Sequence, residues 1–436
     1  MTPESGPGRL NVFQRAMLQW NDLHPYHAVD VLRFRGRPEV DRLRGVIARR
    51  LSLQGLASLR IDRAAGTFHY DGPPLPVEIH EVAAGADPAG TLNVEIERQL
   101  EKRFDIADRF LPFRFFVLVE EGSFLLGTTY FHPVADGESV ARLLRDLATD
   151  YVTGRSVEAP RALELHPPRH DRMLASGSGV AARKVLALPS EIRAQKQSYR
   201  PPLRDPENLC NRVRVTQWPA DALPRLTGTA RAWGVTLHDL LLAIALRALA
   251  PLAPGRHHEL RRRNVTLGTI VNVRRDHGID SGRTFGLFLG SFAVSHGVPE
   301  GIALGQLAAE VHRQTSAVKR SRLYLATPLE LRLACRLAAW SPTPDRRTFY
   351  YRNYPLVGGI TNMNINALWP DDGTRPLDYL RAVSTGPVAP LVLAVITFGD
   401  RMHCGLIWRP AVFTPEDVDL VSAGLSRQVA ELEPGP

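Results

Sequence analysis

The chain of 436 residues is predicted to fold as two α/β lobes, each a two-layer sandwich of a mixed sheet and its covering helices. Its length exceeds the roughly 250 to 300 residues at which a single hydrophobic core stops growing. Strand-like runs and helical segments alternate in both halves, without the strict repeat of a TIM barrel or a doubly wound sheet. Pro, Gly and Ser concentrate over residues 154–204, so we expect an N-terminal lobe over 1–175 and a C-terminal lobe over 176–436.

The first half begins with a predicted helix. Its apolar residues recur at helical spacing, at Val12, Phe13, Ala16, Met17 and Trp20. A strand ("HAVDVLRFRG"), a second helix ("VDRLRGVIARRLSL") and two short strands around an Ala-Ala-Gly turn ("ASLRIDRAAGTFHYDG") are expected to follow.

A β-hairpin is predicted next, because "PFRFFVLV" and "SFLLGTTYFH" are rich in strand-forming residues and only "EEG" separates them. The second of these strands ends at Phe131 and His132, just before Pro133. After Asp136 and Gly137, "ESVARLLRDLATDYVTG" has helical apolar spacing. His132 is therefore expected at a strand end, with Asp136 near the start of a helix.

The second half follows the same alternation. After one helix around "VAARKVLAL", a strand "NRVRVTQWP" precedes a long apolar helix, "TLHDLLLAIALRALA". Five further strands and a C-terminal helix are expected, namely "NVTLGTIVNV", "LFLGSFAVS", "GGITNMNIN", "LVLAVITFG", "MHCGLIWRP" and the helix "TPEDVDLVSAGLSRQVAEL".

The charge is strongly basic, with a net value of +9. Arginines are dense at Arg261–Arg263 and at Arg274–Arg275, which favours an anionic partner such as nucleic acid, the phosphates of coenzyme A or an acidic carrier protein. A solvated arginine-rich surface is the alternative interpretation. Because no zinc-finger spacing or RNA-binding aromatic motif accompanies these arginines, we do not expect a nucleic-acid partner.

Targeting signals are not evident in the sequence. The N-terminus lacks the basic and apolar regions of a secretory signal, and the apolar run 240–252 is interrupted by Arg247 and shorter than the roughly 20 residues of a membrane span. The three cysteines, Cys210, Cys335 and Cys404, have no metal-ligand spacing and are expected to be buried free thiols. We therefore expect a cytoplasmic protein without a membrane span.

The pattern H-x-x-x-D-G, formed by His132, Asp136 and Gly137, carries the candidate chemistry. Histidine titrates near neutral pH, so His132 is suited to take a proton from a hydroxyl or amine that attacks a thioester carbonyl. The alternative is a satisfied core histidine. Asp136 either orients the ring or pairs with an arginine that holds the loop, and Gly137 provides either close backbone approach or a positive φ. A helix that begins here would also direct its N–H groups towards an oxyanion.

Other catalytic patterns are absent from the sequence. It contains no G-x-S-x-G elbow, no Walker A motif and no Rossmann glycine fingerprint after a strand. His166 and His170 are four residues apart, but paired prolines between them exclude a regular helix, so we expect no metal site.

Several segments together resemble the CoA-dependent acyltransferase superfamily, and within it the condensation domains of nonribosomal peptide synthetases and their free-standing acyltransferase relatives. "NVFQRAMLQWNDL", with Gln14 and Arg15, looks like the opening helix motif of that family, and "GLASLRID" like its second motif, which Arg60 closes. "YFHPVADGES" matches the active-site motif. "DLATDY" and "FGLFLGSFAV" resemble further segments, so the resemblance covers almost the entire chain.

This resemblance implies a fold and a set of site residues. The fold is a V-shaped pseudo-dimer of two chloramphenicol-acetyltransferase-like lobes with a central tunnel. His132 is then the general base, Asp136 a structural residue paired with Arg60, and Gly137 a turn glycine. The tunnel-lining candidates, for each of which a polar strand end is the alternative, are Ser291, Thr361 and Asn362.

The implied activity is transfer of an acyl group from a thioester to an alcohol or amine acceptor in secondary metabolism. The donor is acyl-CoA or a phosphopantetheinyl carrier protein, and no permanently bound cofactor is expected. Phe131, which stands where peptide-forming relatives carry a histidine, favours a free-standing acyltransferase, and the absence of an Asp-Phe-Gly-Trp-Gly signature argues against the plant acyltransferase branch. Leu56 also departs from the family, because it stands where histidine is usual. These two residues also leave open a second function, that of a catalytically inactive condensation-like domain that binds a carrier protein and recruits partner enzymes.

Overall fold

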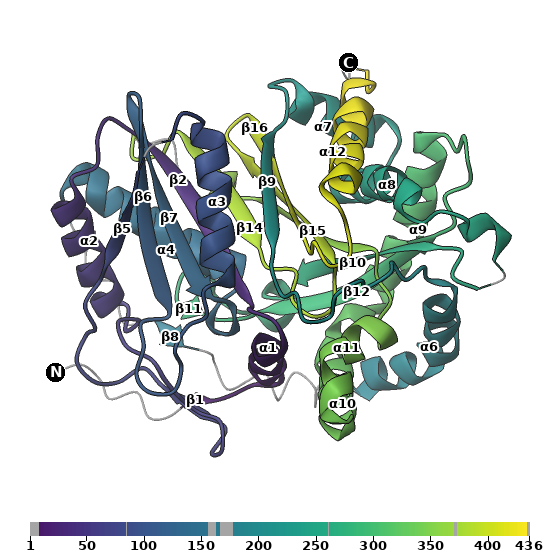
Figure 1. Cartoon of the computed structure of the whole chain (residues 1–436), viewed down its shortest axis with the longest axis horizontal. Coiled ribbons are helices and arrows are strands. Elements are labelled where there is room, and N and C mark those ends of the chain that lie inside the picture. The colour runs from purple at the N-terminus through teal and green to yellow at the C-terminus, as the bar shows by residue number, and fades with distance from the viewer. Residues whose placement is uncertain are drawn as a thin grey trace.

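The computed structural model describes residues 8–83, 85–155, 163–165, 178–259, 261–369 and 373–433. Two sheets dominate it, one on each side of Figure 1, and each is associated with its own helices. This arrangement confirms the predicted two-lobed α/β fold. The predicted boundary between residues 175 and 176 lies outside the described residues.

The first sheet has five strands in the order β14-β2-β7-β6-β5, where β5 and β6 are parallel and the other pairs antiparallel. β7 is buried along its whole length, including its polar residues Ser123, Thr128 and Thr129. The strands from the first half are β2 (His27–Arg35), β5 (Ile79–Val82), β6 (Phe113–Glu120) and β7 (Ser123–Phe131), and their helices are α2 (Val40–Leu53), α3 (Pro88–Glu101) and α4 (Gly137–Thr153).

The second sheet has six strands in the order β12-β10-β13-β15-β16-β9. Its strands are β9 (Arg212–Gln217), β10 (Val265–Asn272), β12 (Leu289–His296), β13 (Gly358–Asn364), β15 (Leu391–Phe398) and β16 (Arg401–Trp408). The helices α7 (Ala222–Ala232), α8 (Leu237–Leu249), α9 (Leu304–Ser321) and α12 (Pro415–Ala430) pack around it. α8 is the most apolar of these and is almost completely buried in the second core.

One strand of the first sheet was not predicted and comes from the second half of the chain. β14 (Asp378–Val383) pairs antiparallel with β2, where Arg381 lies opposite Asp30. In Figure 1 it lies between the purple β2 and the strands of the second sheet. A Cβ on Gly405 of β16 would lie 2.6 Å from the carbonyl oxygen of Arg381, so the two sheets are in close contact here.

Shorter elements complete the fold. Like β14, β11 (Thr284–Phe285) comes from the second half of the chain and pairs with a strand from the first half, β8 (Glu164–Leu165). Phe285 packs into the core of the first lobe. Among the described residues the remaining elements are β1 (Gly8–Arg9), β3 (Arg60–Asp62), β4 (Thr67–His69), α1 (Val12–Leu23), α6 (Ser178–Gln197), α10 (Thr327–Trp340), α11 (Thr343–Asn353) and short 3₁₀ turns. One of these turns, His132–Val134, is part of the candidate site.

The cysteines and the apolar helices bear on the remaining sequence predictions. All three cysteines are free, but only Cys404 is buried, since Cys210 and Cys335 are partly exposed. Among the described residues no single helix is long and apolar enough to cross a membrane. Ala222–Ala232 and Leu237–Leu252 reach that length and composition only as a pair bent by 104°.

Candidate active site

His132 lies where β7 ends and a short 3₁₀ turn begins. Its Nδ1 is 3.0 Å from the carbonyl oxygen of Ala135. A carbonyl oxygen only accepts hydrogen bonds, so Nδ1 must carry the proton, and in the neutral ring Nε2 then holds a lone pair. The turn therefore fixes the tautomer that a general base acting through Nε2 requires.

Two tyrosines enclose the imidazole. The ring of Tyr26 is stacked on it with centroids 5.0 Å apart, and Tyr130 approaches edge-on at 5.5 Å. Burial, and then the positive charge of Arg381, lower the pKa of His132 from 6.5 to about 4. The ring is consequently neutral at physiological pH and ready to accept a proton.

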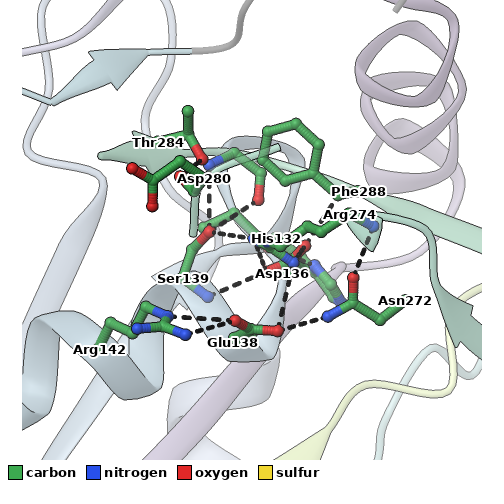
Figure 2. A network of polar contacts seen from close by, with 12 residues as sticks. His132, Asp136, Glu138, Ser139, Arg142, Asn272, Arg274, Asp280, Thr284 and Phe288 are labelled. Atoms are coloured by element: carbon green, nitrogen blue, oxygen red, sulfur yellow. Dashed lines mark hydrogen bonds and ion pairs between the residues drawn. The ribbon is translucent and has the colours of Figure 1, made fainter. Parts of the chain in front are cut away.

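Asp136 caps the helix α4 and is almost completely buried. Its carboxylate accepts hydrogen bonds from the backbone N–H of Ser139 (3.0 Å) and Phe288 (2.9 Å), and from two nitrogens of Arg274 (2.8 Å each), as Figure 2 shows. Burial alone would raise its pKa, but the attraction and hydrogen bonds of Arg274 and the two backbone donors outweigh that effect and lower it. Of the two roles considered for Asp136, pairing with an arginine is the one formed.

The predicted partner of Asp136 was wrong. Arg60 lies exposed on β3, whereas Arg274, from the loop after β10, forms the ion pair. The expectation that Arg274 belongs to a basic surface facing anionic partners is also wrong, because its side chain is only 4% exposed. Its neighbour Arg275 is exposed. The local sequence gave no signal for this pairing, because the two residues are separated by 138 positions.

Ser139, in the first turn of α4, joins the two lobes and was not predicted. Its hydroxyl lies 3.1 Å from the carbonyl oxygen of Gly286 and accepts hydrogen bonds from Arg274 (2.8 Å) and from the backbone N–H of Gly286 (3.2 Å). The N–H of Asp136 also donates to the carbonyl of Gly286, at 3.0 Å. The segment 285–288, which the family resemblance had singled out, is thereby fixed against the H-x-x-x-D-G motif.

Gly137 is required for close packing rather than for a positive φ, since it is not among the glycines with that conformation. A Cβ at this position would lie 2.7 Å from the sulfur of Met363 and 2.9 Å from Cζ of Arg381. Any side chain would therefore displace atoms of β13 or β14. The close approach expected as one alternative for this glycine is the one observed.

Arg381 is a second buried arginine near His132 that the sequence did not reveal. Its Nη1 lies 2.8 Å from both carboxylate oxygens of Asp30, and its Nη2 donates to the hydroxyl of Tyr130 at 2.6 Å. Tyr130 is in turn the edge-on neighbour of His132. Arg381 thus delivers a fixed positive charge beside the imidazole.

The three tunnel-lining candidates, Ser291, Thr361 and Asn362, lie on two strands of the second sheet and do not share one face. Thr361 alternates with Met363 on β13 and so shares the face that meets Gly137, whereas Asn362 points to the other face. Ser291 lies on β12, where its backbone bonds to the hydroxyl of Thr327. None of the three joins the polar network around His132 in the described part of the chain, and a role in a tunnel stays a prediction.

Within the described ranges no cluster of three or more His, Cys, Asp or Glu side chains could hold a metal ion. His166 and His170, the histidine pair in the proline-rich segment, lie outside those ranges.

Neither a protein-family model nor a curated protein matches the sequence. Solved structures do match over nearly the whole chain. The first condensation domain of the calcium-dependent antibiotic synthetase, in complex with a substrate analogue, has a TM-score of 0.69 at 17% identity and covers 99% of this chain and 98% of its own. The chain has the condensation-domain fold.

Two further structures share this fold. The starter condensation domain of rhizomide synthetase RzmA, a mutant in complex with C8-CoA, gives a TM-score of 0.71 at 14% identity and covers 98% of this chain and 95% of its own. The X-domain from teicoplanin biosynthesis gives a TM-score of 0.62 at 18% identity and covers 98% of this chain and 96% of its own.

Proposed function

We propose that the chain is a condensation-type acyltransferase. It transfers an acyl group from a thioester, on coenzyme A or on a carrier protein, to an alcohol or amine. His132 acts as the general base: Nε2 takes the proton of the acceptor as its oxygen or nitrogen attacks the thioester carbonyl. When the tetrahedral intermediate collapses and the C–S bond breaks, the protonated ring returns this proton to the leaving sulfur, which departs as a thiol, and the neutral base is restored. No covalent intermediate on the protein is needed.

The observation that carries this proposal is the hydrogen bond between Nδ1 of His132 and the carbonyl of Ala135. It supports the role of base because it orients the ring and leaves the lone pair on Nε2. The lowered pKa supports it as well, since the ring is neutral before the reaction.

Asp136 and Gly137 are assigned supporting roles. The Asp136 carboxylate accepts hydrogen bonds from Ser139, Phe288 and Arg274. Among the described residues it forms no hydrogen bond with the His132 ring. We therefore assign Asp136 to holding the loop in its conformation. Gly137 lets the start of α4 approach β13 and β14. The Asp136 carboxylate and carbonyl already accept from Ser139 and Val140 at this helix end, so any stabilisation of the developing oxyanion by α4 would have to come from the N–H groups that precede them.

The donor class is proposed from the solved structures with this fold. One of them was solved with C8-CoA and another with a substrate analogue. An acyl thioester is the donor class that fits both the fold and a base without a nucleophile. We assign the reaction to secondary metabolism, as an ester- or amide-forming step.

The test is intact-mass analysis of reactions that offer acyl-CoA and acyl-carrier-protein donors to a panel of alcohols and amines. His132→Ala should lose about 100- to 10,000-fold in turnover, the range typical of a lost general base, while its circular dichroism stays unchanged. A matched control is His238→Asn, because His238 is half-buried and its pKa is also lowered to about 4, but it bonds to Thr269 in the second lobe.

Retention of near wild-type turnover by the His132 variant would refute the mechanism. A wild-type protein that captures a carrier protein and yields no product from any loaded thioester would instead favour the non-catalytic recruiting function. The aromatic position 131 is compatible with both, since Phe131 is fully buried among Phe104, Phe110 and His27.

A further inference from the structure

Exposed apolar side chains gather on two neighbouring helices outside the site. Of the thirteen large hydrophobic residues that are exposed in the described ranges, four lie on α10 and four on α6. Those on α10 are Leu329 (42% exposed), Leu333 (57%), Leu337 (42%) and Trp340 (82%), here called the α10 strip. A soluble protein rarely leaves such a contiguous row without a partner.

The α10 strip follows one face of its helix. Its members are spaced by four, four and three residues, which places them in a row along the helix. The opposite face, with Ala334 and Ala338, packs against the protein. The strip is therefore a protruding ridge.

The α10 strip has helix α6 on one side and helix α1 on the other. On one side Glu330 pairs with Lys184 of α6, which brings that helix and its exposed Val185, Leu188 and Ile192 beside α10. On the other side Arg332 and Arg336 face α1. Figure 1 shows α10 and α6 at the lower right of the molecule, at the opposite end from α12.

Arginines line a cavity of about 450 Å³ along the α1 flank. Arg9, Arg15, Arg332 and Arg336 contribute to its wall, together with Cys335. Within the described residues none of these four arginines forms an ion pair, although Arg15 donates to the backbone carbonyls of Leu10 and Gly66. Both carboxylates of α6 and α10, Glu191 and Glu330, are already paired with Lys184. The surface around the strip therefore carries a net positive charge.

We propose that the α10 strip and its arginines bind the surface of an anionic lipid membrane. The leucines and Trp340 would enter the boundary between head groups and acyl chains, and the four arginines would contact lipid phosphates. A ridge of Leu and Trp bordered by arginines is the arrangement of helices that lie in the plane of a membrane interface. This association is peripheral and does not depend on the proposed acyl transfer.

A lipid surface fits these features better than a protein partner does. A stable protein interface of this composition would seat the large side chains in pockets of complementary shape, whereas a membrane accepts a protruding row without such pockets. Trp340, at the end of the helix and 82% exposed, is placed where an indole prefers the interface. The unpaired arginines supply the charge complementarity to phosphate.

The test is sedimentation of the full chain with vesicles of phosphatidylcholine alone and of phosphatidylcholine mixed with phosphatidylglycerol. We expect binding to the mixed vesicles, weakened by salt, together with a blue shift of tryptophan fluorescence that Trp340→Phe abolishes. Arg332→Gln with Arg336→Gln should weaken binding by about fivefold per arginine. Leu333→Gln with Leu337→Gln should weaken it by about tenfold or more.

The matched control is Leu420→Gln with Arg427→Gln on α12, which changes one exposed leucine and one exposed arginine at the other end of the molecule and should leave binding unchanged. All of these positions are on the surface, so circular dichroism should not change. Equal binding to both vesicles, no binding to either, or loss of binding in the control would each overturn the proposal. So would a complex with an acidic carrier protein that the strip variants abolish, in the absence of vesicle binding.

Discussion

Two buried aspartate–arginine pairs lie near His132, and they differ in how the carboxylate is held. Asp136 joins the lobes and accepts four hydrogen bonds, two from Arg274 and one each from Ser139 and Phe288. Asp30 lies within the first sheet, where Nη1 of Arg381 bridges its two oxygens. The pKa of Asp136 is lowered, whereas burial raises the pKa of Asp30 in spite of Arg381.

The two pairs therefore have different effects on the site: one fixes the conformation of a loop, and the other holds a positive charge beside His132. The Asp136 pair fixes the loop between β7 and α4 to the segment 285–288 of the second lobe. The Asp30 pair instead holds Arg381 beside the imidazole, and Arg381 lowers the pKa of His132. The Asp136 pair therefore positions the base, and the Asp30 pair adds to the effect of burial in lowering the pKa of the base.

The largest expected effect comes from breaking the pair that joins the lobes. Asp136→Ala leaves Arg274 buried without its carboxylate and removes the cap of α4, so the free energy of unfolding should fall by about 3 to 5 kcal/mol. Chemical denaturation measures this, and turnover should fall as well. The matched control is Asp345→Ala, which removes an exposed carboxylate paired with Arg352 and should cost about 0 to 1 kcal/mol. Equal losses in the two variants would contradict the assignment.

A smaller effect is expected from crowding the space between the two pairs. In Gly137→Ala the new methyl group would meet Met363 and Arg381, so stability should fall by about 1 to 3 kcal/mol and turnover should fall with it. Gly424→Ala is the control, because a Cβ there would lie at an ordinary 3.5 Å from Ala248. That helical change should be neutral or slightly stabilising. A Gly137 variant with normal turnover would show that the close approach is unimportant.

The smallest effect should appear in the pH dependence. With an alcohol acceptor, kcat/KM of the wild-type chain should fall only as the pH drops through about 4, because protonated His132 cannot act as a base. Asp30→Asn with Arg381→Gln removes the positive charge that opposes protonation, so this acid limb should move to higher pH. It should stay below 6.5, since burial still lowers the pKa.

Arg50→Gln with Asp150→Asn is the control for that shift, because it removes another buried pair, between α2 and α4. It should lower stability and leave the acid limb in place. The Asp136 pair should not disturb this measurement. Its lowered pKa means that its contribution to stability is present above the unfolded value of about 3.9 and is lost only as the pH falls through the lower folded value. A limb that stays near 4 in the Asp30 and Arg381 variant would contradict the role given to Arg381.

Local features of the site could be predicted from the sequence. The hairpin, the position of His132 at a strand end and the start of a helix after Asp136 all follow from apolar periodicity and from Pro133 and Gly137. The division into two α/β lobes follows from length and alternation. These inferences succeeded because each depends on residues close together in the chain.

Pairings across the chain were not accessible in the same way. Arg274 was interpreted as part of a basic surface, and its true partner is separated from it by 138 residues. β14 was missed altogether, because "DYLRAV" mixes Asp378 and Arg381 with apolar residues and lacks the pattern of a buried strand. All six of its residues are nevertheless buried, since the charges are matched by neighbours in the fold.

The position of β14 has a consequence for synthesis of the protein on the ribosome. β2 is complete by residue 35, but its second neighbour arrives only with residues 378–383. Until then the growing chain presents β2 as an open edge, with Asp30 lacking its arginine, and such edges recruit other strands. The first sheet therefore cannot be completed during translation until residues 378–383 have been made, and the edge of β2 stays open until then.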